Sequence, residues 1–148
     1  MVNKNEIMEA NELMIGDWVF NAHNRKPEQV AKIGCRLVML DYNDMYEYDL
    51  IEPIPLTPEI LEKNGWKKAA FNGGYDRKGM RLDGYNGNEL PEGVENALSF
   101  AQWSIDEHFQ YHLLEIYMWK GSVHLWVHYV HELQHALRLC GIEKEIEL

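Results

Sequence analysis

The sequence is poor in cysteine and in basic residues, and it has no long hydrophobic run. Only Cys35 and Cys140 occur among 148 residues, so we expect neither a disulfide framework nor a cysteine-based zinc site. Lys and Arg number 14 against 24 Asp and Glu, and the formal charge of −10 disfavours binding to nucleic-acid phosphates or anionic lipid. No apolar stretch is long enough to cross a bilayer, and the polar first dozen residues do not resemble a secretory signal. We therefore expect a cytoplasmic protein without nucleic-acid or membrane partners.

The composition is that of an ordinary globular protein. Hydrophobic residues make up 46% of the chain and charged residues 26%, which argues against wholesale disorder. A chain of this length can bury a real core without a disulfide or a metal. It has room for one domain or for two small ones.

Short apolar segments follow one another at a spacing of about ten residues between positions 12 and 52. They are rich in β-branched and aromatic residues, and breakers such as Gly34 separate them. The segments cover 13–20, 29–33, 36–42 and 46–51. This pattern predicts a small antiparallel β-barrel-like module over 12–52, preceded by a flexible tail at 1–11.

The remainder, 53–148, is predicted to form an α+β module. Pro53 and Pro55 favour an extended connector, after which Thr57 and Pro58 are good residues for the start of a short helix at about 58–64. Strand-like composition then covers 66–71, 75–82, 97–106 and 110–119. The predicted fold class is therefore α+β: an N-terminal antiparallel β-barrel-like module, a short helix, and an antiparallel sheet packed by a C-terminal helix.

The C-terminal helix is predicted over about 127–139, but its start is open. Apolar residues recur at helical spacing along one stripe, which consists of Trp126, Val130, Leu133, Leu137 and Cys140. Ser122 could cap a longer helix, or residues 123–127 could form a strand that precedes it. At about 100° per residue, His128, His131 and His135 lie almost opposite the apolar stripe, so we expect these imidazoles to face solvent.

Residues 131–135 match the H-E-x-x-H pattern of zinc hydrolases. On a helix, His131 and His135 can both reach one Zn²⁺, and Glu132 can act as general base on a metal-bound water. A catalytic zinc needs a third protein ligand, and the extended pattern that would supply a third His fails because Gly141 stands there. Only a late glutamate (Glu143, Glu145 or Glu147) or an upstream His could take that place. We therefore expect no catalytic residue, no metal ligand and no cofactor, with the zinc hydrolase as the alternative.

The chain also resembles a protein family in three stretches, which are NELMIGDWV at 11–19, IEPIPLTPEILEKNGW at 51–66 and YVHELQ at 129–134. In this order they are similar to a group of small two-module proteins of gut anaerobic bacteria and their phages or mobile elements, which has no assigned activity. In that group a residue other than histidine stands at the position of His135. The resemblance implies that His131 and Leu133 belong to a shared helix signature and that the second histidine is particular to this chain.

These observations predict a non-enzymatic accessory or protein-interaction protein of phage or mobile-element origin. Its acidic surface favours a protein partner, whose identity and oligomeric context the sequence does not give. The chain is also rich in Trp and Tyr, and any that the cores leave exposed would mark an interaction patch.

Overall fold

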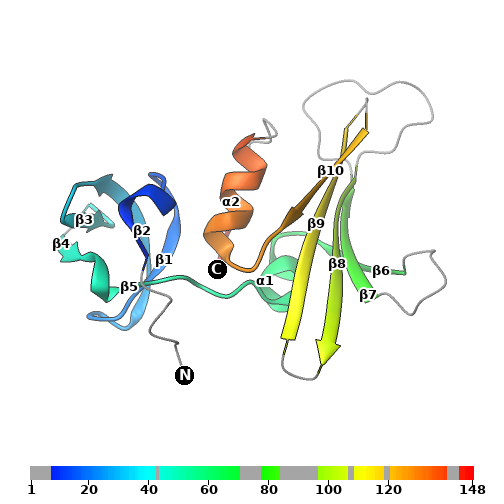
Figure 1. Ribbon diagram of the computed structural model, residues 1–148, viewed down its shortest axis with the longest axis horizontal. Coiled ribbons are helices and arrows are strands. Elements are labelled where there is room, and N and C mark those ends of the chain that lie inside the picture. The colour runs from blue at the N-terminus through cyan, green and yellow to red at the C-terminus, as the bar shows by residue number, and fades with distance from the viewer. Residues whose placement is uncertain are drawn as a thin grey trace. The chain divides into compact units, whose positions relative to one another are not determined.

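Figure 1 shows the computed structural model of the chain, which describes residues 8–42, 44–70, 78–83, 97–106, 109–118, 121–139 and 144–148. The chain divides into two compact units. The first comprises the described part of 1–55 together with Tyr129–His135, and the second comprises the described parts of 56–128 and 136–148. The last helix therefore contributes its first residues to one unit and its remaining residues to the other.

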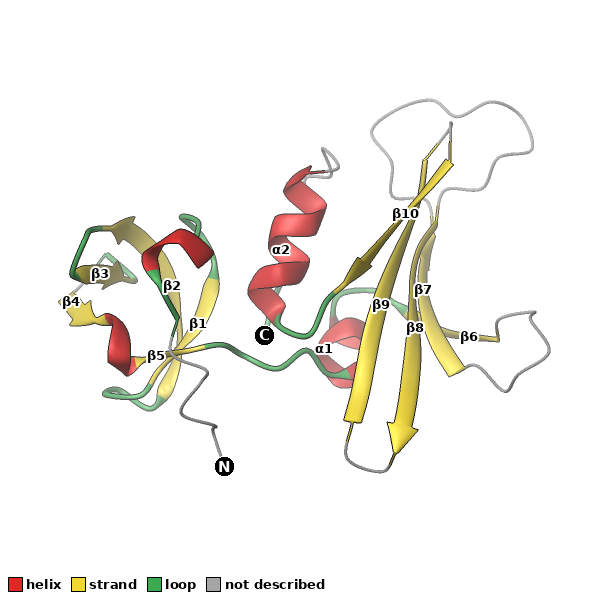
Figure 2. Ribbon diagram, viewed as in Figure 1, coloured by secondary structure: helices red, strands yellow, loops and turns green. Residues whose placement is uncertain are grey.

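The first unit is a curled antiparallel sheet of five strands (Figures 1 and 2). The strands are β1 (Trp18–Asn21), β2 (Lys26–Ile33), β3 (Leu37–Leu40), β4 (Asp44–Glu47) and β5 (Ile51–Glu52), in the order β4-β3-β2-β1-β5. Two short 3₁₀ helices accompany them, η1 (Ala10–Glu12) and η2 (Tyr48–Leu50). This curled half-barrel agrees with the predicted β-barrel-like module at the level of a curled antiparallel sheet.

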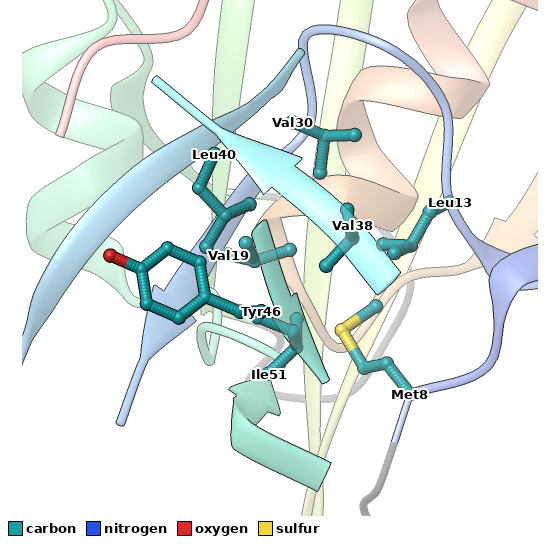
Figure 3. Packing of buried hydrophobic residues seen from close by; sticks show 8 residues of the cluster. All are labelled: Met8, Leu13, Val19, Val30, Val38, Leu40, Tyr46 and Ile51. Atoms are coloured by element: carbon teal, nitrogen blue, oxygen red, sulfur yellow. The ribbon is translucent and has the colours of Figure 1, made fainter. Parts of the chain in front are cut away.

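One hydrophobic cluster fills the inside of this sheet (Figure 3). It consists of Met8, Leu13, Val19, Val30, Val38, Leu40, Tyr46 and Ile51, all 9% exposed or less. Because successive side chains of a strand point to opposite faces, Val38 and Leu40 enter the cluster while Leu37 between the turn and Val38 stays exposed. The Tyr46 hydroxyl lies at the margin, where it accepts a hydrogen bond of 3.0 Å from the Asn24 side-chain amide.

The tail predicted at 1–11 lies only partly within the described residues. Residues 1–7 lie outside the described part, but Met8 is only 3% exposed and belongs to the core cluster. Glu9 and Glu12 then cap η1, and the Glu9 amide donates to the Glu12 carboxylate over 2.8 Å. The buried Met8 side chain attaches the end of this segment to the sheet.

The second unit contains a second antiparallel sheet of five strands and the short helix α1 (Pro58–Lys63). Its strands are β6 (Lys67–Ala70), β7 (Lys78–Asp83), β8 (Ala97–Asp106), β9 (Phe109–Met118) and β10 (Gly121–Trp126), in the order β10-β9-β8-β7-β6. Helix α1 begins as predicted: Thr57 is the N-cap, and its hydroxyl accepts from the Ile60 amide. Trp66 is 1% exposed and packs under the Lys144 ammonium, 5.9 Å from the ring centroid.

The last helix, α2 (Val130–Leu139), begins three residues later than the predicted 127–139. Of the two alternatives for its start, the structure has the strand, since β10 ends at Trp126. The connecting backbone is held extended because the Leu56 amide donates to the His128 carbonyl over 2.9 Å and Tyr129 bridges to Pro55. Trp126 is accordingly a strand residue, 55% exposed, and is not part of the helical apolar stripe.

The fold is thus α+β, with a curled antiparallel sheet and helices among its described elements. None of the helices described is both long enough and apolar enough to span a membrane. Cys35 is exposed, and Cys140 lies outside the described residues.

Candidate functional site

Of the three histidines expected to face solvent, His131 is buried, whereas His128 and His135 are partly exposed. His131 is only 7% exposed, and the His135 side chain is 24% exposed. The apolar stripe is also buried: Val130 and Leu133 are 0% exposed and Leu137 is 1% exposed. Helix α2 is therefore covered on more than its apolar side, which the angular pattern of one helix could not indicate.

His135 contacts Asp17, the residue before β1 and 118 positions earlier in the chain. Asp17 is completely buried, and its Oδ2 atom lies 2.6 Å from His135 Nε2. The same Oδ2 accepts a hydrogen bond of 2.7 Å from the Met14 amide, which closes the turn before β1. A buried carboxylate needs such partners, and the imidazole and the amide supply them.

Gln134 joins the same turn to the helix through both ends of its amide. Its Oε1 atom accepts from the Trp18 amide over 2.8 Å, and its Nε2 atom donates to the Gly16 carbonyl over 3.0 Å. Gly16 has a φ of 92°, a backbone conformation that favours glycine. Neither Gln134 nor Asp17 was predicted as a site residue, because their partners lie 116 and 118 positions away along the chain.

Glu132 serves the helix itself. Tyr129 precedes the first helical residue, and its amide donates to Glu132 Oε1 over 3.0 Å. This is the glutamate half of a capping box, which satisfies a backbone donor at the helix N-terminus. The residue that the zinc alternative assigns as general base thus holds the start of α2.

His131 lies between two rings and lacks a polar partner at one nitrogen. Its ring stacks on Tyr129 at a centroid distance of 5.8 Å and meets His135 edge-on at 5.5 Å. Its Nδ1 atom is buried without a hydrogen-bond partner. Burial lowers the pKa of His131, an effect that the carboxylates of Glu132, Asp17 and Glu12 oppose and that His135 reinforces.

Within the described ranges, no three His, Cys, Asp or Glu side chains are grouped so that they could hold a metal ion. Of the third ligands considered for zinc, Glu145 and Glu147 are exposed in the second unit, and Glu143 lies outside the described residues. The residues nearest to a ligand set are His131, His135 and Asp17. Asp17 pairs with the Nε2 atom of His135.

A second candidate site is the outer face of β3 and β4, formed by Leu37, Met39 and Met45. Met39 pairs with Met45 across the two strands, and Leu37 pairs with Glu47, so these side chains share the face opposite the core. Leu37 is 36% exposed and Met45 is 43% exposed. We call these three residues the β3–β4 face.

The turn between β3 and β4 presents Tyr42, which is 79% exposed. Asp41 and Tyr42 have φ values of 50° and 56°, in the left-handed region that bulky residues rarely adopt. Two hydrogen bonds of 2.8 Å tie this turn to β2: the Asp41 amide donates to the Gln29 carbonyl, and the Gln29 amide donates to Asp41 Oδ1. Asp41 is therefore attached to β2, and the next residue, Tyr42, places its aromatic side chain in solvent.

The chain matches no protein-family model, no curated protein and no solved structure. Fold alone does not determine function, since one fold supports many activities. The functional assignment accordingly depends on the side chains of the two candidate sites.

Proposed function

We propose that the chain is a non-enzymatic protein-interaction protein and that it contacts its partner through the β3–β4 face and Tyr42. The observation that carries the proposal is Tyr42, an aromatic side chain 79% exposed on a backbone that disfavours it. A left-handed conformation costs about 1–3 kcal/mol for such a residue, and costs of this kind are concentrated at functional positions. Tyrosine is also a residue type enriched in protein interfaces.

The neighbouring apolar side chains support the same proposal. Leu37 and Met45 are each more than a third exposed, and burying them against a partner would gain about 25 cal/mol for every Å² removed from water. Methionine side chains adapt their shape to a partner surface. In line with the family resemblance, the proposal includes a cytoplasmic accessory role and a phage or mobile-element origin.

The contacts in the histidine motif are the reason for preferring this proposal to a zinc hydrolase. Glu132 accepts the Tyr129 amide, and His135 lies 2.6 Å from a buried carboxylate. These contacts stabilise the start of α2 and its attachment to the turn before β1. Metal analysis of untagged protein distinguishes the two: the proposal expects no stoichiometric zinc, and a full equivalent that is lost in His131→Ala would favour the hydrolase.

The interaction proposal is tested by panning a random peptide library on the immobilised chain. Peptides recovered on the natural chain should lose most of their binding to a double variant with Tyr42→Ser and Met45→Ser. A matched double variant with Met14→Ser and Ile15→Ser removes apolar side chains that are 42% and 60% exposed elsewhere in the same unit. That control should bind as the natural chain does; equal loss in both variants, or no enriched peptide, would refute the proposal.

A further inference from the structure

We infer that the partner contributes an extended, basic segment, which pairs with β4 and extends the first sheet by one strand. The inference rests on the proposed function and names the chemistry of the partner. Three observations carry it: the position of β4 in the sheet, the side chains that β4 presents, and the charges around it.

Strand β4 is at one end of the order β4-β3-β2-β1-β5, and no described strand pairs with its other edge. An edge strand directs alternate N–H and C=O groups away from the sheet, where they can hydrogen-bond to another chain. An extended peptide that adds to such an edge gains main-chain hydrogen bonds, while side chains on alternate positions determine its specificity.

The side chains of β4 define what an added strand must carry. Tyr46 points into the core, whereas Met45 and Glu47 point to the outer face. Neighbouring residues on the same face of two paired strands have Cβ atoms about 4.5–5.5 Å apart. The added segment should therefore place an apolar residue against Met45 and a Lys or Arg two positions away, against Glu47.

The charges around β4 favour a basic partner over a second copy of this chain. The exposed acids Asp41, Asp44, Glu47 and Asp49 lie on β4 or within three residues of it, and the nearest basic residue along the chain is Arg36, next to the Leu37 that pairs with Glu47. Two such edges would place like charges opposite each other, which destabilises a strand pair. With a formal charge of −10, the chain as a whole also attracts a cationic partner.

The test uses synthetic peptides and the complete chain. One eight-residue peptide alternates Thr with Lys and Val, so that Lys and Val share one face and lie two positions apart; a second carries Glu in place of each Lys. Titrations followed by NMR should give at least tenfold tighter binding of the Lys peptide at low salt, weakening as salt is added. Amide hydrogen exchange should slow at Asp44–Glu47. The alternate amides of the peptide form two sets, one facing β4 and one facing away, and N-methylation should abolish binding for only one of these sets.

A charge reversal provides the decisive variant. Glu47→Lys should remove most of the preference for the Lys peptide, because the acid expected to face the peptide's Lys is replaced while Asp41, Asp44 and Asp49 remain. Glu59→Lys, at an exposed position of α1, makes the same change in net charge and should leave the preference unchanged. The dispersion of the NMR amide signals is first compared with that of the natural chain, because peptide binding is compared only between folded variants.

The possible results distinguish a failure of the inference from a failure of the proposed function. If panning enriches peptides that depend on Tyr42 but these are acidic, or leave β4 exchange unchanged, the inference is wrong and the proposed function stands. If the chain alone forms dimers with slowed exchange at Asp44–Glu47, the occupant is a second copy and the inference is overturned. If no peptide depends on Tyr42, the proposed function fails and the inference fails with it.

Discussion

At the scale of single residues, the H-E-x-x-H pattern shows how contacts decide what a motif does. The spacing of His131 and His135 places both rings on one side of a helix, which is compatible with a metal site. In this chain the same side is covered by the turn that carries Gly16 and Asp17. The contact observed for Glu132 caps the start of α2, and the contact observed for His135 attaches α2 to the turn before β1.

The first prediction concerns the buried Asp17 of this turn. Asp17→Ala removes the acceptor of both the Met14 amide and the His135 ring, so we expect a loss of about 3 kcal/mol in the free energy of unfolding. Urea unfolding followed by circular dichroism measures this loss as a lower midpoint. Asp49→Ala, at an exposed acid of the same unit, should change stability by about 0.5 kcal/mol or less. Equal effects of the two substitutions would contradict the assigned role of Asp17.

The second prediction is a pH dependence of stability due to His131. Its pKa is lowered in the folded state by burial, so between that value and the unfolded value of about 6.5 the unfolded chain binds the proton and the folded chain does not. The stabilising contribution is complete above about pH 6.5 and is lost as the pH falls through the lowered pKa. Urea midpoints at a series of pH values should show this loss.

His131→Phe keeps a ring beside Tyr129 and removes the titrating nitrogens, so this part of the pH dependence should disappear. His23→Gln is the comparison variant, because His23 is an exposed histidine of the same unit. A pH profile that is identical in the natural chain and in His131→Phe would refute the prediction.

What the sequence could predict at this scale was limited by distance along the chain. The pattern identified His131, Glu132 and His135 as residues of interest, but the partner of His135 is 118 positions away. A helical periodicity describes two faces of one helix and does not contain the element that covers the second face. Burial of the histidines therefore could not be deduced without the turn at Gly16 and Asp17.

At the scale of helices and strands, the local sequence predicted more of the structure than it did for the histidine contacts. Thr57 and Pro58 define the start of α1 because an N-cap hydroxyl and a proline at the first helical position are local requirements. The predicted segment 97–106 matches β8 and the segment 36–42 contains β3, whereas the predicted segment 46–51 is divided among β4, η2 and β5. The start of α2 was ambiguous because the backbone pairing that delays it, between Leu56 and His128, joins distant parts of the chain.

The third prediction concerns Asn64, which connects the end of α1 to the C-terminal segment. Its Nδ2 atom donates to the carbonyls of Ile60 and Glu147 over 2.8 and 2.7 Å, and its Oδ1 atom accepts from the Glu147 amide over 2.8 Å. Each net hydrogen bond contributes about 1 kcal/mol, so Asn64→Ala should reduce the free energy of unfolding by about 2–3 kcal/mol.

Amide hydrogen exchange at Glu147 tests this connection directly. The exchange should be much faster in Asn64→Ala, because the acceptor of that amide is gone. Asn64→Asp keeps an acceptor oxygen and should preserve part of the protection. Unchanged exchange in Asn64→Ala would show that the C-terminal segment is held by other contacts.

At the scale of the whole molecule, the two units are not consecutive pieces of the chain. The first unit needs Tyr129–His135 in addition to the residues before position 56, and the second unit resumes at Ala136. The prediction of modules at 12–52 and 53–148 follows the composition of the chain, which changes near the prolines of the connector. Composition cannot indicate that a late helix returns to the first sheet, since that depends on specific contacts such as those of Gln134.

The last prediction follows from this interleaving. A fragment of residues 8–55 lacks Gln134 and His135, which bind Gly16, Trp18 and Asp17, so a buried carboxylate and two backbone groups of the fragment would lose their partners. Such losses each cost about 1–3 kcal/mol, a large part of the stability of a small domain. We expect the fragment alone to give poorly dispersed NMR amide signals and to gain dispersion when a peptide of residues 127–139 is added.

The peptide also provides the control for this experiment. A peptide with Gln134→Ala and His135→Ala keeps the apolar residues Val130 and Leu133 but lacks the polar contacts, so it should restore the fragment at least tenfold less effectively. If the fragment folded fully without any peptide, the contacts of α2 would be dispensable for the first sheet. The proline connector would then separate two modules that fold independently. The contacts of Asp17 would need a role other than folding.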